Sequence, residues 1–218
     1  MKPYYQDDYC TIYHGDCREI LPSLPKVDLV LTDPPYGIGA SRNDFIGIKP
    51  RKHACSVPKD YGHSEWDNAP VEKSLLQSII SHGSKAIVFG GNFYELPASR
   101  CWLVWDKDNG NVSFADCELA WTNLEMAVRK FRFKWQGMLQ ENMASKEVRV
   151  HPTQKPVPLM TWCINFAPDA QTILDPFMGS GTTLRAAKDL RRKCIGIEIE
   201  EKYCEIAVQR LRQEVLAL

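Results

Sequence analysis

The spacing of hydrophobic residues predicts strands and helices that alternate along the chain. Short apolar runs rich in Val, Ile and Leu are typical of buried strands. These runs are Val27–Thr32, Lys85–Phe89, Cys101–Trp105, Thr172–Asp175 and Lys193–Glu198. Helical spacing is present at Val71–His82, Pro156–Phe166, Gly181–Arg191 and Glu200–Leu216. The alternation predicts an α/β fold with a mostly parallel sheet and helices on both faces.

Two further parts of the chain do not follow this alternation of strands and helices. Asp116–Thr122 and Glu125–Phe133 are predicted to form a pair of strands. Residues 37–68 show no regular spacing and are predicted to form a long loop, and loops of that length are usually functional or disordered.

The distribution of charge is more informative than its sum. The chain has 27 Lys and Arg residues against 27 Asp and Glu, which argues against a simple polycationic nucleic-acid binder. Residues 41–62 nevertheless carry five basic and two acidic side chains, and residues 129–155 carry seven basic and two acidic ones. Solvent-exposed loops and surfaces that contact nucleic acid are equally good interpretations of these two segments.

Length and composition narrow the class of protein. A chain of 218 residues with 44% hydrophobic residues is expected to form one globular domain. It has no apolar run of the roughly 20 residues that a membrane span needs, and its first residues lack a signal-peptide core, so a cytoplasmic protein is expected. The eight cysteines form no C-x-x-C pair, so reduced, buried thiols without a metal site are expected.

The run Ile173–Thr183 combines the end of a predicted strand, a glycine turn and the start of a helix. Gly179 and Gly181 let the backbone approach a ligand, and the helix offers free N–H groups. Glu198 ends the next predicted strand, nineteen positions after Gly179, where an acid can bind ribose hydroxyls. The third glycine of a dinucleotide motif is missing, and Asp175 would repel a pyrophosphate but attract an ammonium group. These features favour S-adenosylmethionine over a nicotinamide cofactor.

A second turn, Asp33-Pro34-Pro35-Tyr36, follows the predicted strand Val27–Thr32. Pro34 and Pro35 fix the backbone and lack N–H donors, so the carbonyls at this strand end can face a ligand. Asp33 and the Pro34 carbonyl are a pair of acceptors, and Tyr36 adds an aromatic face. This group suits adenine or cytosine taken out of a duplex. Acceptors that hold both amino hydrogens leave the nitrogen lone pair free to attack a sulfonium methyl.

The two motifs resemble those of the S-adenosylmethionine-dependent DNA amino-methyltransferases. The Asp-Pro-Pro-Tyr turn precedes the Phe-x-Gly-x-Gly turn, which is the permuted order of the β class. Small phage-type or prophage-type members have segments similar to Tyr13–Ile20, Phe89–Asn92, Trp102–Lys107, Phe114–Trp121 and His151–Pro156. The resemblance covers most of the chain. It implies a Rossmann-like sheet of seven strands with both sites at the carboxyl ends of strands.

The resemblance also implies residue roles. The catalytic residues would be Asp33, Pro34, Pro35 and Tyr36. The cofactor-binding residues would be Asp16, Asp33, Thr153, Lys155, Asp175, Phe177, Gly179, Ser180, Gly181, Thr182 and Glu198, with Asp16 near the adenine and Thr153 and Lys155 at the methionine end. The basic residues expected to contact DNA are Arg42, Lys49, Arg51, Lys52, Arg132 and Lys134. Residues 1–218 would form a single methyltransferase domain, with a small basic target-recognition region at 125–150.

The implied function is site-specific DNA adenine N6-methylation, because Asp-Pro-Pro-Tyr is more typical of adenine than of cytosine amino-methylation. Cytosine N4-methylation by the same machinery is the first alternative, and a catalytically silent DNA-binding regulator on the same scaffold is the second. RNA or protein-glutamine methylation and a nicotinamide oxidoreductase are weaker alternatives. The expected partners are double-stranded DNA, a second copy of the chain and a restriction nuclease, in a bacterium or its phage.

Overall fold

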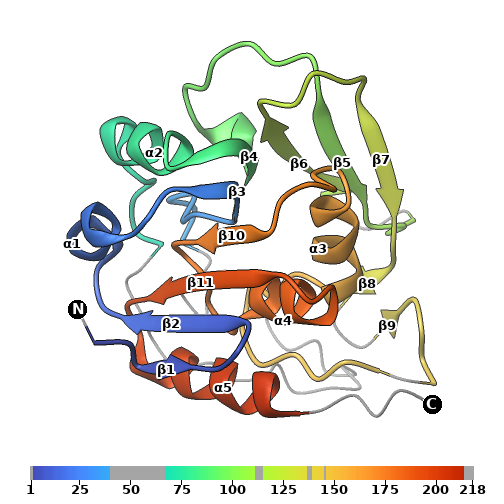
Figure 1. Ribbon diagram of the computed structural model, residues 1–218. Coiled ribbons are helices and arrows are strands. Elements are labelled where there is room, and N and C mark those ends of the chain that lie inside the picture. Colours follow the sequence, from blue (N-terminus) through green and yellow to red (C-terminus); the bar gives the residue numbers. More distant parts are fainter. Residues whose placement is uncertain (1, 40–66, 111–114, 137–138, 145, 214–218) are drawn as a thin grey trace.

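The computed structural model describes residues 2–39, 67–110, 115–136, 139–144 and 146–213. In these ranges the strands are β1 (Tyr5–Gln6), β2 (Cys10–His14), β3 (Val27–Thr32), β4 (Gly83–Phe89), β5 (Trp102–Asp106), β6 (Cys117–Thr122), β7 (Arg129–Arg132), β8 (Trp135–Gln136), β9 (Leu139–Gln140), β10 (Thr172–Asp175) and β11 (Lys193–Glu198). The helices are α1 (Cys17–Ile20), α2 (Lys73–Ile80), α3 (Val157–Ile164), α4 (Thr182–Asp189) and α5 (Glu201–Arg212). Figure 1 shows the elements in an α/β arrangement.

The described part of the chain contains a nine-stranded sheet in the order β1-β2-β11-β10-β3-β4-β6-β5-β7. Strands β2, β11, β10, β3 and β4 run parallel to their neighbours in that list, and β7 runs parallel to β5. Strand β6 is antiparallel to both β4 and β5, and β1 is antiparallel to β2. The predicted α/β class with a largely parallel sheet is confirmed, and part of the sheet is antiparallel.

Two details of the predicted sheet are wrong. It has nine strands in the described residues rather than seven, because the short strands β1 and β7 extend it at its two edges. The segments predicted as a pair of strands, β6 and β7, do not pair with each other. Both flank β5, β6 antiparallel and β7 parallel, so the chain crosses over β5 after Thr122.

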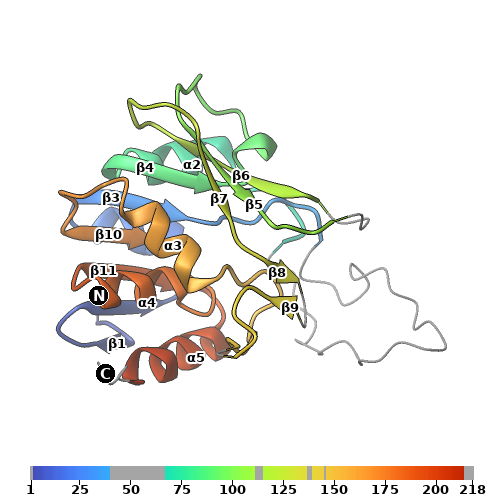
Figure 2. The same cartoon turned by 90° about the vertical axis from the view of Figure 1, so that its right-hand side faces the viewer.

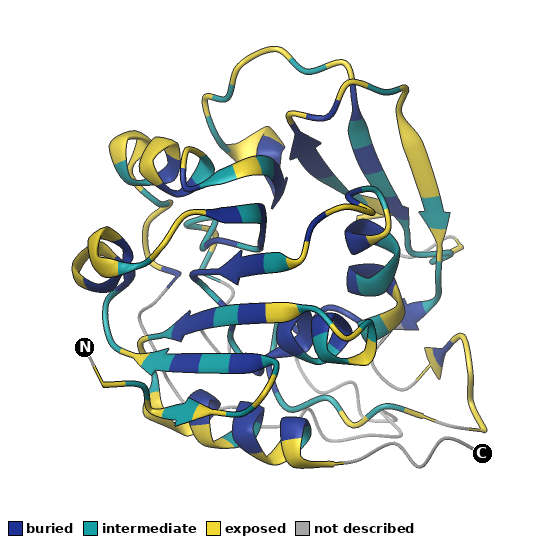
Figure 3. Cartoon of the chain, viewed as in Figure 1, coloured by how far each residue is buried: buried dark blue, intermediate teal, exposed yellow. Residues whose placement is uncertain are grey.

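Side chains of β3 point alternately to the two faces of the sheet, and both faces are apolar, so helices can pack on each of them. Leu29 and Leu31 belong to one core cluster, to which α3, α4 and α5 contribute, while Val30 belongs to another, which includes Leu76 and Ile79 of α2. Figure 2 shows α3, α4 and α5 on one side of the sheet. In Figure 3 the central strands are dark blue, in keeping with strands buried on both faces.

Two expectations from composition concern membranes and cysteines. None of the helices in the described residues has the length and apolarity that a membrane span needs. The cysteines in these residues are free thiols, and all of them except Cys117 are buried. Cys55 lies outside the described residues.

Candidate functional site

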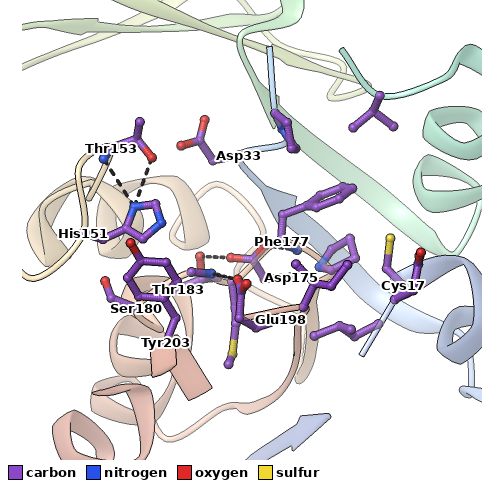
Figure 4. A pocket seen from close by; sticks show the side chains of 18 of the residues that line it. Cys17, Asp33, His151, Thr153, Asp175, Phe177, Ser180, Thr183, Glu198 and Tyr203 are labelled. Carbon is purple, nitrogen blue, oxygen red and sulfur yellow. Dashed lines mark hydrogen bonds between the residues drawn. The ribbon is translucent and has the colours of Figure 1, made fainter. Parts of the chain in front are cut away.

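A cavity of about 460 Å³ is lined by residues that follow β3, β10 and β11 at their carboxyl ends. In Figure 4, Asp175 and Phe177 lie between Asp33 and Glu198. The predicted site residues that line the cavity are Asp16, Asp33, Pro35, Thr153, Lys155, Asp175, Phe177, Gly179, Ser180, Thr182 and Glu198. The fold therefore joins the two predicted turns in one site, as expected for parallel strands that end at one edge of a sheet.

Three predicted site residues, Pro34, Tyr36 and Gly181, do not line this cavity. Gly181 is the residue before α4 and has a φ of +78°. A Cβ on Gly181 would lie 2.8 Å from the Cβ of Ala207, so the glycine lets α4 and α5 pack closely. Its role in the structure is to shape the turn rather than to face the cavity.

The glycine turn is held against the end of β11 by a carboxylate. Gly179 has a φ of +49°, and its N–H donates to Oε2 of Glu198 at 2.9 Å. The N–H of Glu200 donates to the other carboxylate oxygen at 2.8 Å. Burial raises the pKa of Glu198 to about 7, against the lowering effect of these N–H donors. The carboxylate still has acceptor capacity for a hydroxyl donor.

The Asp175 carboxylate accepts several hydrogen bonds that the sequence does not predict. The donors are the hydroxyls of Thr32 at 2.9 Å and Thr183 at 2.6 Å, and the N–H of Phe177 at 3.2 Å. Burial raises its pKa to about 6 although these donors oppose the shift. Asp175 thus ties the ends of β3 and β10 to α4, in addition to lining the cavity.

The Asp33 carboxylate carries two donors from the protein itself. Lys155 Nζ lies 2.5 Å from Oδ2, and the Tyr36 hydroxyl donates to Oδ1. Burial raises the pKa of Asp33, and the nearby Glu118 raises it further, whereas Lys155 lowers it. Lys155 is predicted at the methionine end of the cofactor, but its ammonium group contacts Asp33 of the Asp-Pro-Pro-Tyr turn in the structure.

Aromatic residues fix the remainder of this turn. The Tyr36 ring stacks on Phe93 with a centroid distance of 4.8 Å and an interplanar angle of 15°. The Tyr94 hydroxyl donates to the Pro35 carbonyl at 2.5 Å and lies 3.3 Å from the Pro34 carbonyl. The Pro34 carbonyl, predicted as a free acceptor, therefore already has a hydroxyl neighbour. Phe93 therefore covers one face of the Tyr36 ring.

Asp16 and Thr153 approach the cavity from two other segments. Asp16 precedes α1, and its carboxylate accepts the N–H of Arg18 at 2.8 Å and forms an ion pair with the guanidinium of the same residue at 2.5 Å. The N–H of Thr153 donates to Nδ1 of His151 at 3.3 Å. Both residues line the cavity as predicted, each with a local partner.

Several residues at the site are not predicted from the sequence. His151 and Tyr203 line the cavity, and their rings meet edge to face at 4.3 Å. Burial lowers the pKa of His151 to about 3, so the ring is neutral at physiological pH. Glu118 and Tyr94 reach the Asp33 turn from β6 and from the segment after β4. His151 stands beside the predicted Thr153, but nothing in the sequence brings Glu118 near Asp33.

Two of the predicted DNA contacts, Arg132 and Lys134, are not among the residues that line the cavity. Arg132 and Lys134 both form ion pairs with Asp108, at 2.7 and 3.2 Å. The other four predicted contacts, Arg42, Lys49, Arg51 and Lys52, lie outside the described residues, as does most of the predicted 37–68 loop.

The polar groups that line the cavity fit S-adenosylmethionine. The carboxylates of Asp16, Asp175 and Glu198 line it, and they can accept hydrogen bonds from hydroxyl and ammonium groups. The cations among its described lining residues, Arg18 and Lys155, are both paired with acids. This chemistry suits a ligand with an amino acid and a ribose, and it is unfavourable for a pyrophosphate.

Known proteins with similar sequences are bacterial methyltransferases. The type II methyltransferase M2.LlaDCHI of Lactococcus lactis subsp. cremoris is 44% identical over 256 residues, which cover 97% of this chain and 93% of that protein. The type II methyltransferase M.ScaI of Streptomyces caespitosus is 27% identical over 265 residues, covering 100% of this chain and 86% of that protein.

Solved structures share the fold. The complex of M1.HpyAVI with SAM has a TM-score of 0.59 and 24% identity, covering 94% of this chain and 100% of the other. The cytosine-N4-specific PvuII DNA methyltransferase has a TM-score of 0.59 and 18% identity, and the match covers 99% of this chain and 91% of the other.

A family model described as DNA methylase matches residues 98–209, which is just over half of the chain. This match includes the glycine turn and Glu198 but begins after the Asp33 turn. The match with M2.LlaDCHI covers 97% of this chain, so it extends over the part before residue 98 as well. The chain therefore belongs to the N6/N4 DNA methylase family, whose members are S-adenosylmethionine-dependent DNA methyltransferases.

Proposed function

We propose that this protein is a site-specific DNA adenine N6-methyltransferase that acts on an adenine flipped out of the duplex. The observation that carries the proposal is that Asp33 and the glycine turn line the same cavity. A base held at Asp33 and a cofactor held at Gly179 would be neighbours in that cavity. Such positioning removes much of the entropic barrier to a reaction between two bound molecules.

The catalytic turn supplies acceptors and a charge. When bound, S-adenosylmethionine supplies an electrophilic methyl group on a sulfonium sulfur. The Asp33 carboxylate and the Pro34 carbonyl would accept the amino hydrogens and direct the nitrogen lone pair toward the glycine turn. The amino nitrogen would gain positive charge on methylation. The Asp33 carboxylate would stabilise that charge and accept the proton that the nitrogen releases, before passing it to solvent.

We propose adenine rather than cytosine as the target base because of the residue that begins the turn. The turn reads Asp-Pro-Pro-Tyr, and within the family that Asp is more typical of adenine amino-methylation than of cytosine amino-methylation. The chemistry at the amino group would be the same for either base. The identity of the methylated nucleoside therefore tests this part of the proposal separately from the mechanism.

We further propose that the region 125–150, within a single methyltransferase domain, contacts DNA. Figure 2 shows β8 and β9 at the same end of the molecule as the segment that follows β3. Three apolar side chains near β9 are strongly exposed: Leu139 at 54%, Met143 at 55% and Val148 at 70%. Exposed apolar groups of this kind mark a surface that a binding partner covers.

The test uses unmethylated DNA of mixed sequence and labelled S-adenosylmethionine. After incubation, the DNA is digested and the nucleosides are identified by mass. We expect N6-methyladenine; N4-methylcytosine would keep the mechanism and correct the base. We also expect Asp33→Ala to abolish transfer while cofactor affinity changes little. Loss of cofactor binding in this variant would contradict the assigned division of roles between Asp33 and the glycine turn.

A further inference from the structure

Four charged side chains of alternating sign form a row beside the cavity. Lys107 pairs with Glu118 at 2.5 Å, Glu118 with Lys155 at 3.0 Å, and Lys155 with Asp33 at 2.5 Å. Their side chains are only partly accessible, from 7% for Lys155 to 25% for Glu118. They come from four separate segments: the turn after β3, the residue after β5, strand β6, and the residues before α3.

This row leaves the catalytic acceptor occupied in the free protein. Lys155 sits on Oδ2 of Asp33, and the Tyr36 hydroxyl donates to Oδ1. Each oxygen of Asp33 accepts one of these donors, so an amino group that binds the carboxylate competes with them for space and for the remaining lone pairs. A displaced ammonium group in a site this enclosed is costly unless another anion accepts it.

Glu118 is built to be that second anion. Its Oε1 is held by Lys107, whereas its buried Oε2 faces Lys155 at 3.0 Å without a well-directed hydrogen bond. This oxygen therefore already lies beside the ammonium group and can hold it when Lys155 leaves Asp33. Burial alone would raise the pKa of Glu118, but Lys155 and Lys107 lower it to about 2. The carboxylate is thus ionised throughout the physiological range.

We propose that Glu118 is a positioning residue that draws Lys155 away from Asp33 when the target amino group binds. The proposal rests on the function proposed above, in which Asp33 holds that amino group. Lys155 then acts as a movable cap: it bridges Asp33 and Glu118 in the free protein and stays with Glu118 alone when the base is present. No covalent bond is made or broken in this step, because the ammonium group gives up one of its two carboxylate partners.

The test compares Glu118→Gln with the matched control Glu95→Gln. Glu95 also pairs with a lysine, Lys73 at 2.6 Å, but both side chains are largely exposed. In Glu118→Gln we expect kcat to fall by about ten- to a hundredfold, the factor that corresponds to one charge-assisted hydrogen bond. The KM for DNA and the affinity for S-adenosylmethionine should change little. Glu118→Asp, which keeps the charge, should recover part of kcat, and Glu95→Gln should match the natural protein.

The pH profile separates positioning from a structural role. The groups that act on Asp33 are Lys155, Tyr36 and Glu118, and Asp33 in turn acts on Tyr94 and Asp175. Glu118 raises the pKa of Asp33, so its neutralisation should move the acidic limb of the kcat profile to lower pH. In a Lys155→Met background, Glu118→Gln should cause no further loss of kcat.

The outcomes distinguish the two proposals. If the natural protein yields no methylated base, the proposed function fails, whatever Glu118 does. If the natural protein methylates DNA and Glu118→Gln retains its kcat, only the role of Glu118 is overturned. A fall in kcat that Glu118→Asp does not relieve, without a shift of the acidic limb, would also overturn it, because that result indicates a structural defect.

Discussion

The carboxylates around the cavity differ in the donors that already hold them. Asp175 has two hydroxyls and one N–H, Asp33 has an ammonium group and a hydroxyl, and Glu198 has two backbone N–H groups. Backbone donors leave a carboxylate in a fixed place, whereas a side-chain ammonium can move. Glu198 is therefore suited to binding a ligand repeatedly in one geometry, and Asp33 to exchanging partners.

Cofactor affinity should depend on pH through Glu198. Burial raises its pKa to about 7, so the carboxyl is increasingly protonated as the pH falls below 7. Ribose hydroxyls need the ionised form as acceptor, so the affinity for S-adenosylmethionine should weaken with falling pH, approaching about tenfold per unit well below 7. Isothermal titration calorimetry measures the affinity for S-adenosylmethionine at each pH. The range from about pH 5.5 to about pH 8.5 extends at least one unit to either side of the pKa of Glu198.

Glu198→Gln should bind more weakly at high pH and lose the dependence above about pH 6, below which Asp175 also becomes protonated. Glu201→Gln, in the exposed first turn of α5, is the control that alters a nearby charge without touching the turn. A natural protein with the same affinity across this range would refute the assigned role of Glu198.

At the scale of elements, the strands that carry the site are those best predicted from sequence. The predicted bounds Val27–Thr32, Thr172–Asp175 and Lys193–Glu198 coincide with β3, β10 and β11. Buried parallel strands are continuous apolar runs, and glycine or proline turns mark their ends. The predicted helices are longer than the observed ones, since the apolar pattern continues into capping turns.

The elements that sequence reasoning missed are short or depend on distant pairing. Strand β1 has two residues, and β2 owes its place to pairing with β11, on the other side of the sequence. Glu118 becomes part of the site only because β6 lies between β4 and β5. The order of strands is a property of the whole sheet, and no local motif around Glu118 specifies it. The Asp33 turn and the glycine turn could be picked out from the sequence because each is a short local motif at the end of a predicted strand.

The end of β4 supports the catalytic turn through Gly90. This residue has a φ of +66°, and a Cβ on it would lie 2.1 Å from Cε1 of Tyr36. Gly110 has a similar φ of +63° but nothing within 4 Å of its Cβ position. Gly110→Ala should therefore cost about 1 kcal/mol of backbone strain, whereas Gly90→Ala should cost about 1–3 kcal/mol more because Tyr36 must move.

Urea denaturation measures both free energies of unfolding, and the methylation rate measures the displacement of Tyr36. We expect a lower kcat in Gly90→Ala and an unchanged kcat in Gly110→Ala. Equal losses of stability in the two variants would show that Tyr36 does not pack against the Gly90 backbone as described.

At the scale of the molecule, acids neutralise several cations of β7 and of the residues just after it. Lys130 pairs with Asp106 at 3.2 Å, while Arg132 and Lys134 share Asp108. The excess of basic residues that the sequence shows in 129–155 is thus partly neutralised by acids at the end of β5 and in the residues that follow it. Counting charges along the chain overestimates the field that DNA would meet, because pairing across strands is invisible in that count.

This pairing gives a quantitative expectation for DNA binding. If Arg132 and Lys134 contact phosphates, two independent cations would contribute about 2 to the slope of log affinity against log salt. Since both share Asp108, the double variant Arg132→Ala/Lys134→Ala should lower the slope by only about 1. Asp108→Asn should act in the opposite direction, because it frees both cations, and steepen the slope. Fluorescence anisotropy with a duplex at several salt concentrations measures the slope, and identical slopes in all three proteins would place the DNA away from β7.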